Sequence, residues 1–181
     1  MTLSSARARW LGAWLVVAAL AWWQPAVAQL AVPPLTGHVT DQTGTLTAEQ
    51  KASLEQTLTA FEARKGSQLA VLMVRSTAPE AIEPYALRVA EQWKLGRKGV
   101  DDGVLLLIAK QDKKLRIEVG YGLEAYLTDY DSKRIIEELI VPAFKQNNYY
   151  KGVDDATDRI IGLITGSYTN DGSKSVADQM P

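Results

Sequence analysis

Two short segments of the sequence carry acidic side chains beside glycines. One is Asp101-Asp102-Gly103, and the other is the loop GYGLE at residues 120–124. Carboxylates, together with backbone carbonyls that glycine leaves accessible, are the oxygen ligands that suit Ca²⁺ or Mg²⁺. Carboxylates placed close together repel one another unless a positive group joins them. The residue types therefore indicate a divalent-cation site if the fold brings the two segments together.

A β-hairpin is expected to bring them together. Residues 104–109 (VLLLIA) are almost wholly apolar, which predicts a central strand buried on both faces. After a polar turn at 111–113, apolar and charged residues alternate, which predicts the partner strand. With a turn centred near Asp112, paired residue numbers sum to about 224, so that Val104 faces Gly120. Both acidic segments would then lie at one end of the sheet.

The residues predicted to bind a ligand at that end fall into two groups. The acidic group holds Asp101, Asp102 and Glu124, with Asp129 and Asp131 as further candidates. The pocket group holds Gly103, Gly120, Tyr121, Gly122 and Lys98, and Lys98 belongs to a basic segment, KLGRK, that would suit a phosphate. A solvated basic loop is the commoner role of such a segment. The alternative for the acids is structural, with a turn at 101–102 and a helix cap at 129 or 131, and spacing alone favours it.

Composition excludes several classes of chemistry. The chain has no cysteine, which excludes disulfides, thiol catalysis and zinc–thiolate sites. Its one histidine, His38, excludes a multi-histidine metal site within one chain, and its linker-like surroundings predict a solvated side chain. The net charge of −1 argues against a nucleic-acid-binding surface. The pair Gly120-x-Gly122 lacks the third glycine of a dinucleotide fingerprint. No EF-hand, Walker A, GxSxG or HExxH motif occurs.

The N-terminal residues follow the pattern of a cleavable signal peptide. Arg7 and Arg9 precede an apolar run that ends at Trp23, and small residues at Ala26 and Ala28 complete a cleavage site. The apolar run is shorter than the roughly 20 residues of a spanning helix, and no second run is long enough to span a bilayer. We therefore predict export, to the periplasm or beyond the cell, with no transmembrane helix retained.

The remaining pattern predicts a single α/β domain. Thr47 and Gln50 have capping-box spacing before a helix at 48–65. Further helices are predicted at 82–94, at 131–146 with a kink at Pro142, and at 153–164, with a strand at 68–75. Helices alternating with buried strands predict a three-layer α/β/α sandwich around a mixed sheet. The predicted organisation is a signal peptide at 1–28, a linker at 29–38, the domain at 39–166 and a disordered tail at 167–181.

Several motifs resemble the TPM domain family. They are VTDQTGTL at 39–46, QWKLGRKGVDDGVLLLI at 92–108, EVGYGLEAYLT at 118–128 and IVPAFKQNNYYKG at 140–152. The resemblance extends from Val39 to about Thr165 and implies the α/β/α sandwich. It also implies, from some members, divalent-cation binding by acidic loops, which assigns Asp101, Asp102, Glu124 and Asp41 as metal ligands. Plant members have been credited with acid phosphatase activity and photosystem II repair, and nothing in this sequence indicates a photosynthetic host.

Two functions are consistent with these features. The first is an exported, non-catalytic module that binds Ca²⁺ or Mg²⁺ and assists envelope or membrane protein complexes. The second is a metal-dependent acid phosphatase acting on small phosphate esters, with Asp101 or Asp102 as ligand or nucleophile and Lys98 or Arg97 opposite the phosphate charge. The sequence shows no histidine base and no nucleophile motif, which favours binding over catalysis.

Overall fold

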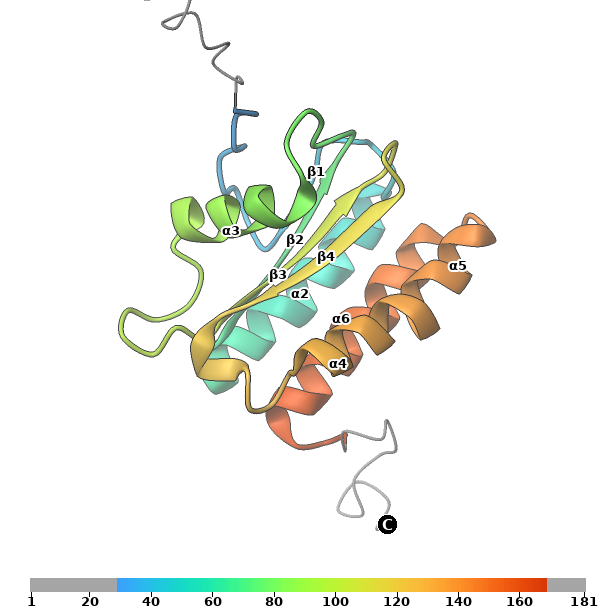
Figure 1. Ribbon diagram of the computed structural model, residues 1–181. Helices are drawn as coiled ribbons and strands as arrows, with labels where there is room; N and C mark the ends of the chain where they lie inside the picture. Colours follow the sequence, from blue (N-terminus) through green and yellow to red (C-terminus); the bar gives the residue numbers. More distant parts are fainter. Residues whose placement is uncertain (1–28, 169–181) are drawn as a thin grey trace, which may run out of the picture.

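The computed structural model describes residues 29–168 and centres on a four-stranded sheet (Figure 1). Its strands lie in chain order: β1 (Val39–Asp41), β2 (Gln68–Val74), β3 (Gly103–Ala109) and β4 (Lys114–Val119). The first three are parallel and β4 is antiparallel to β3, so the sheet is mixed as predicted. The predicted signal peptide lies outside the described residues, as does the predicted tail beyond residue 168.

The β3–β4 hairpin forms with a register one residue away from the predicted one. Val104 pairs with Val119, and Ala109 pairs with Lys114, so that four residues form the turn. The predicted pairing sum of 224 would have required an odd number of residues in the turn, whereas the observed turn has four. The turn instead places Lys113 in the left-handed region, with φ at 53°. All seven residues of β3 are buried, as the unbroken apolar run predicted.

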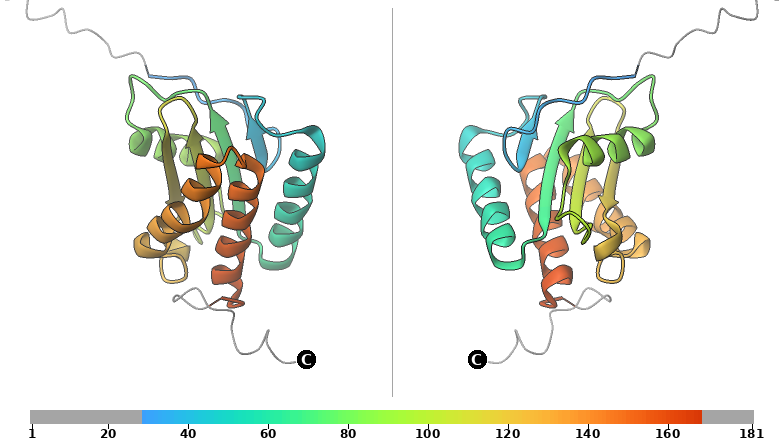
Figure 2. Two further views of the ribbon diagram at one scale, coloured as in Figure 1. Left: turned by 90° about the vertical axis from the view of Figure 1, so that its right-hand side faces the viewer. Right: turned by 90° about the vertical axis from the view of Figure 1, so that its left-hand side faces the viewer.

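Helices cover both faces of the sheet, which confirms the three-layer arrangement (Figure 2). On one face α3 (Ile82–Trp93) buries Tyr85, Ala86 and Val89 against residues of β2 and β3. The other face carries α2 (Ala48–Lys65), α6 (Tyr149–Thr165) and the helical segment between β4 and α6. Because strand side chains alternate between faces, β3 supplies Leu106 to one core and Leu105 and Leu107 to the other.

Helix α2 begins and ends where the sequence predicts. The Thr47 hydroxyl accepts from the Gln50 amide, and the Gln50 side chain accepts from the Thr47 amide, which completes the capping box. Gly66 terminates the helix in a left-handed conformation. Leu54, Leu58 and Phe61 form its fully buried stripe.

The predicted kinked helix is a helical segment with a wide turn in the middle. It consists of α4 (Asp129–Arg134), a π-helical stretch η2 (Ile135–Ile140) and α5 (Val141–Lys145). Pro142 explains the wide turn, because proline cannot donate to a carbonyl one turn earlier and its ring crowds that carbonyl. Helix α6 begins at Tyr149, four residues before the predicted start, after Asn147 turns the chain with φ at 61°.

The predicted linker at 29–38 is extended, but its first part packs along α3. The Trp93 indole Nε1 donates to the Pro33 carbonyl at 2.7 Å, and the Arg88 guanidinium donates to the Leu30 carbonyl at 2.8 Å. Leu30 and Val32 pack against the α3 core. Within the described part of the chain, no helix has both the length and the apolar character needed to span a bilayer.

Candidate functional site at the loop end of the sheet

The structure brings the two acidic segments together at one end of the sheet. We call this region the loop end and define it as residues 95–102 and 120–128. The Gly120 amide donates to the Gly103 carbonyl at 2.8 Å, and the Gly122 amide donates to the Asp101 carbonyl at 3.1 Å. A Cβ on Gly120 would overlap the Asp101 carbonyl oxygen, and one on Gly122 would overlap that of Val100. Glycine is therefore needed here so that the two loops can touch.

Asp102 is the buried anchor of the loop end. Its side chain is 2% exposed. One oxygen accepts from the Arg97 amide at 2.7 Å, and the other accepts from the Arg97 guanidinium at 2.6 and 2.9 Å and from the Ser67 hydroxyl at 3.1 Å. Burial by itself raises the pKa of Asp102, but these hydrogen bonds outweigh it and hold the pKa below its usual value. Because both oxygens are engaged, Asp102 matches the structural alternative rather than a metal ligand.

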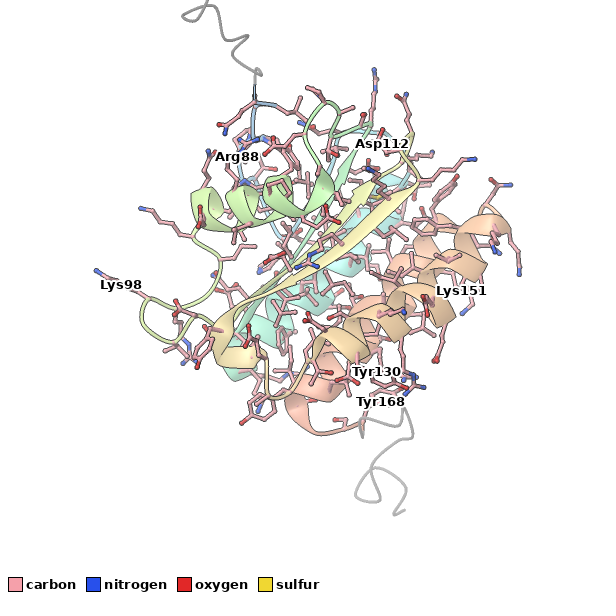
Figure 3. The ribbon with its side chains drawn as sticks, in the orientation of Figure 1. Arg88, Lys98, Asp112, Tyr130, Lys151 and Tyr168 are labelled. Carbon is pink, nitrogen blue, oxygen red and sulfur yellow. The ribbon has the colours of Figure 1, made fainter. Side chains whose placement is uncertain are left out.

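Gly103 is buried in β3, whereas the other predicted side chains of this end lie at the surface. Asp101 is exposed and has a left-handed backbone, with φ at 55°. Lys98 is also exposed and extends from the tip of its loop into solvent (Figure 3). Tyr121 begins the short 3₁₀ turn η1 (Tyr121–Leu123) and is 82% exposed. Glu124 follows this turn and is exposed as well.

Asp41 lies at the opposite end of the sheet, so it does not join the other predicted ligands. It pairs with Met73 at the far end of β2, whereas Gly103, next to Asp102, pairs with Gln68. Its carboxylate accepts from the amides of residues 43, 45 and 46 at 2.7–2.9 Å and closes the turn before α2. Asp131 is also structural, because it completes a capping box with Thr128.

A hollow of about 390 Å³ lies beside the loop end, along β4. Three carboxylates line it, those of Glu118, Glu124 and Asp129. Glu118 is already paired with Arg116, whose Nε lies 2.9 Å from its carboxylate. Within residues 29–168, no three histidine, aspartate or glutamate side chains are grouped as a metal site. The four predicted ligands thus do not form one cation site, although Glu124 keeps an acidic neighbour in Asp129.

One charged cluster was not predicted. His38 Nδ1 lies 3.0 Å from Glu55, and Nε2 lies 2.7 Å from Glu62. The ring is 19% exposed, so the expectation of a solvated histidine was wrong. Glu55 also accepts from the amides of His38 and Val39, which fixes the entry into β1. Glu55 and Glu62 are seven residues apart on one helix face, and this spacing was the available signal.

The comparisons with known proteins decide the family. The family model described as the TPM domain matches residues 39–163, most of the chain. The chain belongs to the TPM domain family. None of the curated proteins matches it.

Solved structures of related domains carry the same fold. The N-terminal domain of a P. gingivalis protein is 31% identical, with a TM-score of 0.68, and the alignment covers 75% of this chain and 90% of that one. BA42 from Bizionia argentinensis is 21% identical with a TM-score of 0.57, covering 72% and 90%. The N-terminal domain of a Corynebacterium glutamicum protein is 15% identical with a TM-score of 0.55, covering 82% and 93%. The last two show the fold alone.

The motifs that resemble the TPM family are distributed over both ends of this TPM domain. Those at 92–108 and 118–128 build the loop end and the β3–β4 hairpin, and that at 140–152 spans α5 and the turn into α6. The motif at 39–46 contains β1 and the turn closed by Asp41. Much of the resemblance therefore reflects residues that shape turns.

Proposed function

We propose that this TPM domain is an exported accessory module that binds a protein partner in the cell envelope through its loop end. The observation that carries the proposal is the placement of exposed apolar side chains. Six large hydrophobic residues are exposed among those described: Leu35, Leu87, Val100, Tyr121, Tyr126 and Tyr130. The last four lie on the loop end or in the first turn of α4. Tyrosine is enriched at protein interfaces, where its ring supplies contact area and its hydroxyl a polar contact.

The loop end also has the rigidity that a binding surface needs. The buried carboxylate of Asp102 anchors the 95–102 loop by accepting three hydrogen bonds from Arg97 and one from the Ser67 hydroxyl. The Gly122 amide ties the second loop to the first. Because the backbone is fixed before a partner arrives, little conformational entropy is lost on binding. Asp101, Glu124 and Lys98 are exposed on the same two loops, so the loop end combines apolar and charged side chains, as interfaces commonly do.

The experiment compares a loop-end variant with a control variant on α3. Val100→Ser with Tyr121→Ser removes the apolar centre of the loop end, and Leu87→Ser removes an exposed apolar side chain on α3, 49% exposed. Each tagged protein is expressed in the native host, chemically cross-linked and isolated from the envelope. We expect the wild type and Leu87→Ser to retain a common partner that the loop-end variant loses while its melting temperature is unchanged. Retention of that partner by the loop-end variant would contradict the proposal.

A second proposal concerns a divalent cation. Glu124 and Asp129 line one hollow, and among residues 29–168 neither has an arginine partner such as Glu118 has. Two carboxylates with water would give a weak site of the ~10⁻⁴–10⁻³ M class found in extracellular modules. Calcium titration followed by NMR should shift the amides near these two residues, and Glu124→Gln with Asp129→Asn should abolish the shifts. Unchanged spectra at millimolar calcium would rule the site out.

The phosphatase alternative is less well supported by this geometry. Arg97 and Asp102 are bonded to each other, so neither is poised for phosphate or for nucleophilic attack. Asp101 and Lys98 remain exposed beside them. Cleavage of a phosphate ester that requires metal and is lost in Asp101→Ala would favour this alternative over the binding module.

A further inference from the structure

A larger hollow, of about 420 Å³, lies at the end of the sheet opposite the loop end. The β3–β4 hairpin forms one wall, and α5 with the start of α6 forms the other. Asp112 marks the tip of this hairpin in Figure 3, on the far side of the molecule from Lys98. The floor is apolar, with Leu115, Val141 and Phe144. The volume lies within the range of small-molecule sites.

Four lysines surround this apolar floor. Three come from the hairpin, Lys110, Lys113 and Lys114, and Lys145 comes from α5. No acidic residue is among those that line the hollow. Asp112, the acid of the turn, does not line the hollow: its carboxylate accepts from the Thr77 amide at 2.8 Å and the Ser76 hydroxyl at 2.7 Å, and the nearby charge of Lys114 adds to these bonds in lowering its pKa. The hollow therefore concentrates positive charge in a chain whose net charge is −1.

Lys110 is held in place before any ligand binds. Its Nζ donates to the Thr45 hydroxyl at 2.9 Å and lies 4.4 Å from the centre of the Tyr149 ring. These contacts use the ring face and one of the three ammonium donors, which leaves donors for an anion. A fixed ammonium loses less conformational entropy on binding than a freely moving one.

We propose that this lysine-rimmed hollow binds a small amphipathic anion. The acid group, a carboxylate or a phosphate monoester, would bind the lysines, and a short alkyl or aryl body would cover Leu115, Val141 and Phe144. Inorganic phosphate would leave the apolar floor in water, and a neutral alcohol would leave the lysines unpaired. The hollow therefore favours a ligand that has both an apolar body for its floor and an acid group for its lysines. This function is independent of partner binding at the loop end.

The test is an NMR titration of the chain from Gln29 onward, which keeps every described element. The probes are octanoate, octyl phosphate, inorganic phosphate and octanol, each below the concentration at which it forms micelles. We expect octanoate and octyl phosphate to shift amides of residues 108–115 and 141–149 saturably, and comparison of these two distinguishes carboxylate from phosphate. Inorganic phosphate and octanol should bind at least about tenfold more weakly, the size of one lost charge-assisted contact.

Matched lysine variants complete the test. Lys110→Gln with Lys114→Gln should weaken octanoate or octyl phosphate binding by about tenfold or more, whereas Lys65→Gln, exposed on α2, should not. All three proteins should unfold cooperatively, the lysine pair variant at a slightly lower temperature because it loses the Lys110 contacts with Thr45 and Tyr149. The loop-end variant should still bind. The proposal is overturned if neither amphiphile saturates, if inorganic phosphate or octanol binds as tightly, or if the lysine pair has no effect. Binding only to anionic vesicles, with no response to the monomeric amphiphiles, would also overturn it by indicating a membrane surface.

Discussion

The guanidinium of Arg97 bonds the buried carboxylate of Asp102 through two nitrogens, at 2.6 and 2.9 Å. The two partners differ in environment, because the Asp102 side chain is 2% exposed and that of Arg97 is 55% exposed. Arg97 thus covers Asp102 from the solvent side while its own amide donates to the second carboxylate oxygen. The pair fixes the loop that presents Val100 and Asp101 to solvent.

Removing Arg97 should destabilise the domain more than a surface substitution does. Arg97→Ala leaves a buried carboxylate short of donors, and we expect a loss of about 1–3 kcal/mol in the free energy of unfolding. The lower half of that range applies, because water reaches the exposed side of the pair. Urea unfolding measures the change, with Arg64→Ala on α2 as the control. An equal, small effect of both substitutions would contradict the anchoring role.

The contribution of Asp102 to the free energy of unfolding should depend on pH in the acidic range. Its folded pKa lies below the ordinary value of 3.8 because hydrogen bonds outweigh burial. Such a group adds stability that is present above its unfolded pKa and is lost as pH falls through the folded pKa. The gap in unfolding free energy between the wild type and Asp102→Asn should therefore be widest near neutral pH and narrow below about 3.8. A gap that widens on acidification would contradict this account.

Two glycines of the loop end should respond differently to alanine. A methyl group on Gly122 meets the Val100 carbonyl oxygen, whereas one on Gly99 meets nothing within 4 Å but requires φ at 76°. We expect Gly122→Ala to cost about 2 kcal/mol or more through overpacking and Gly99→Ala about 1 kcal/mol through backbone strain. Thermal melts rank the two, and exchange of the residue-122 amide, which donates to the Asp101 carbonyl, should accelerate only in the first variant. The reverse ranking would show that the loops are not in close contact.

His38 should stabilise the domain in a pH-dependent way of the opposite sign. Burial alone lowers the pKa of His38, but hydrogen bonds to Glu55 and Glu62 and their charges raise it above 6.5. Its contribution is complete below the unfolded pKa and is lost as pH rises through the raised folded pKa. The melting temperature of His38→Gln should therefore fall further below that of the wild type at about pH 5.5 than at about pH 9. A difference that is constant between these two values would show that the ring does not titrate against the glutamates.

Local signals in the sequence predicted much of the fold. The capping box at Thr47, the stop at Gly66 and the apolar run of β3 each depend on neighbours along the chain, and each was confirmed. The hairpin register depends on the turn conformation at Lys113, which the residue type does not reveal. The prediction that the two acidic segments meet was nevertheless confirmed, because a register shift of one residue leaves both segments at the same end of the sheet.

The roles of the acidic residues could not be predicted in the same way. Whether Asp102 binds a ligand or anchors a loop depends on where Arg97 lies. Gly96 and Gly99, both at positive φ, shape this loop, but their residue types do not specify the bonds between Arg97 and Asp102. The position of Asp41 depends on the strand order, which places β1 beside β2 with its acid at the far end. The lysine-rimmed hollow likewise requires α5 to meet the hairpin, a contact between residues far apart in the sequence.

The most direct test of the proposed function is site-specific photo-cross-linking in the envelope of the native host. A photoreactive amino acid replaces Tyr121 at the loop end in one strain and Leu87 on α3 in the other, and both positions are exposed. Partner binding at the loop end predicts one discrete cross-linked species from position 121 that position 87 does not give. No adduct from position 121, or the same adducts from both positions, would contradict the claim that the loop end binds a partner.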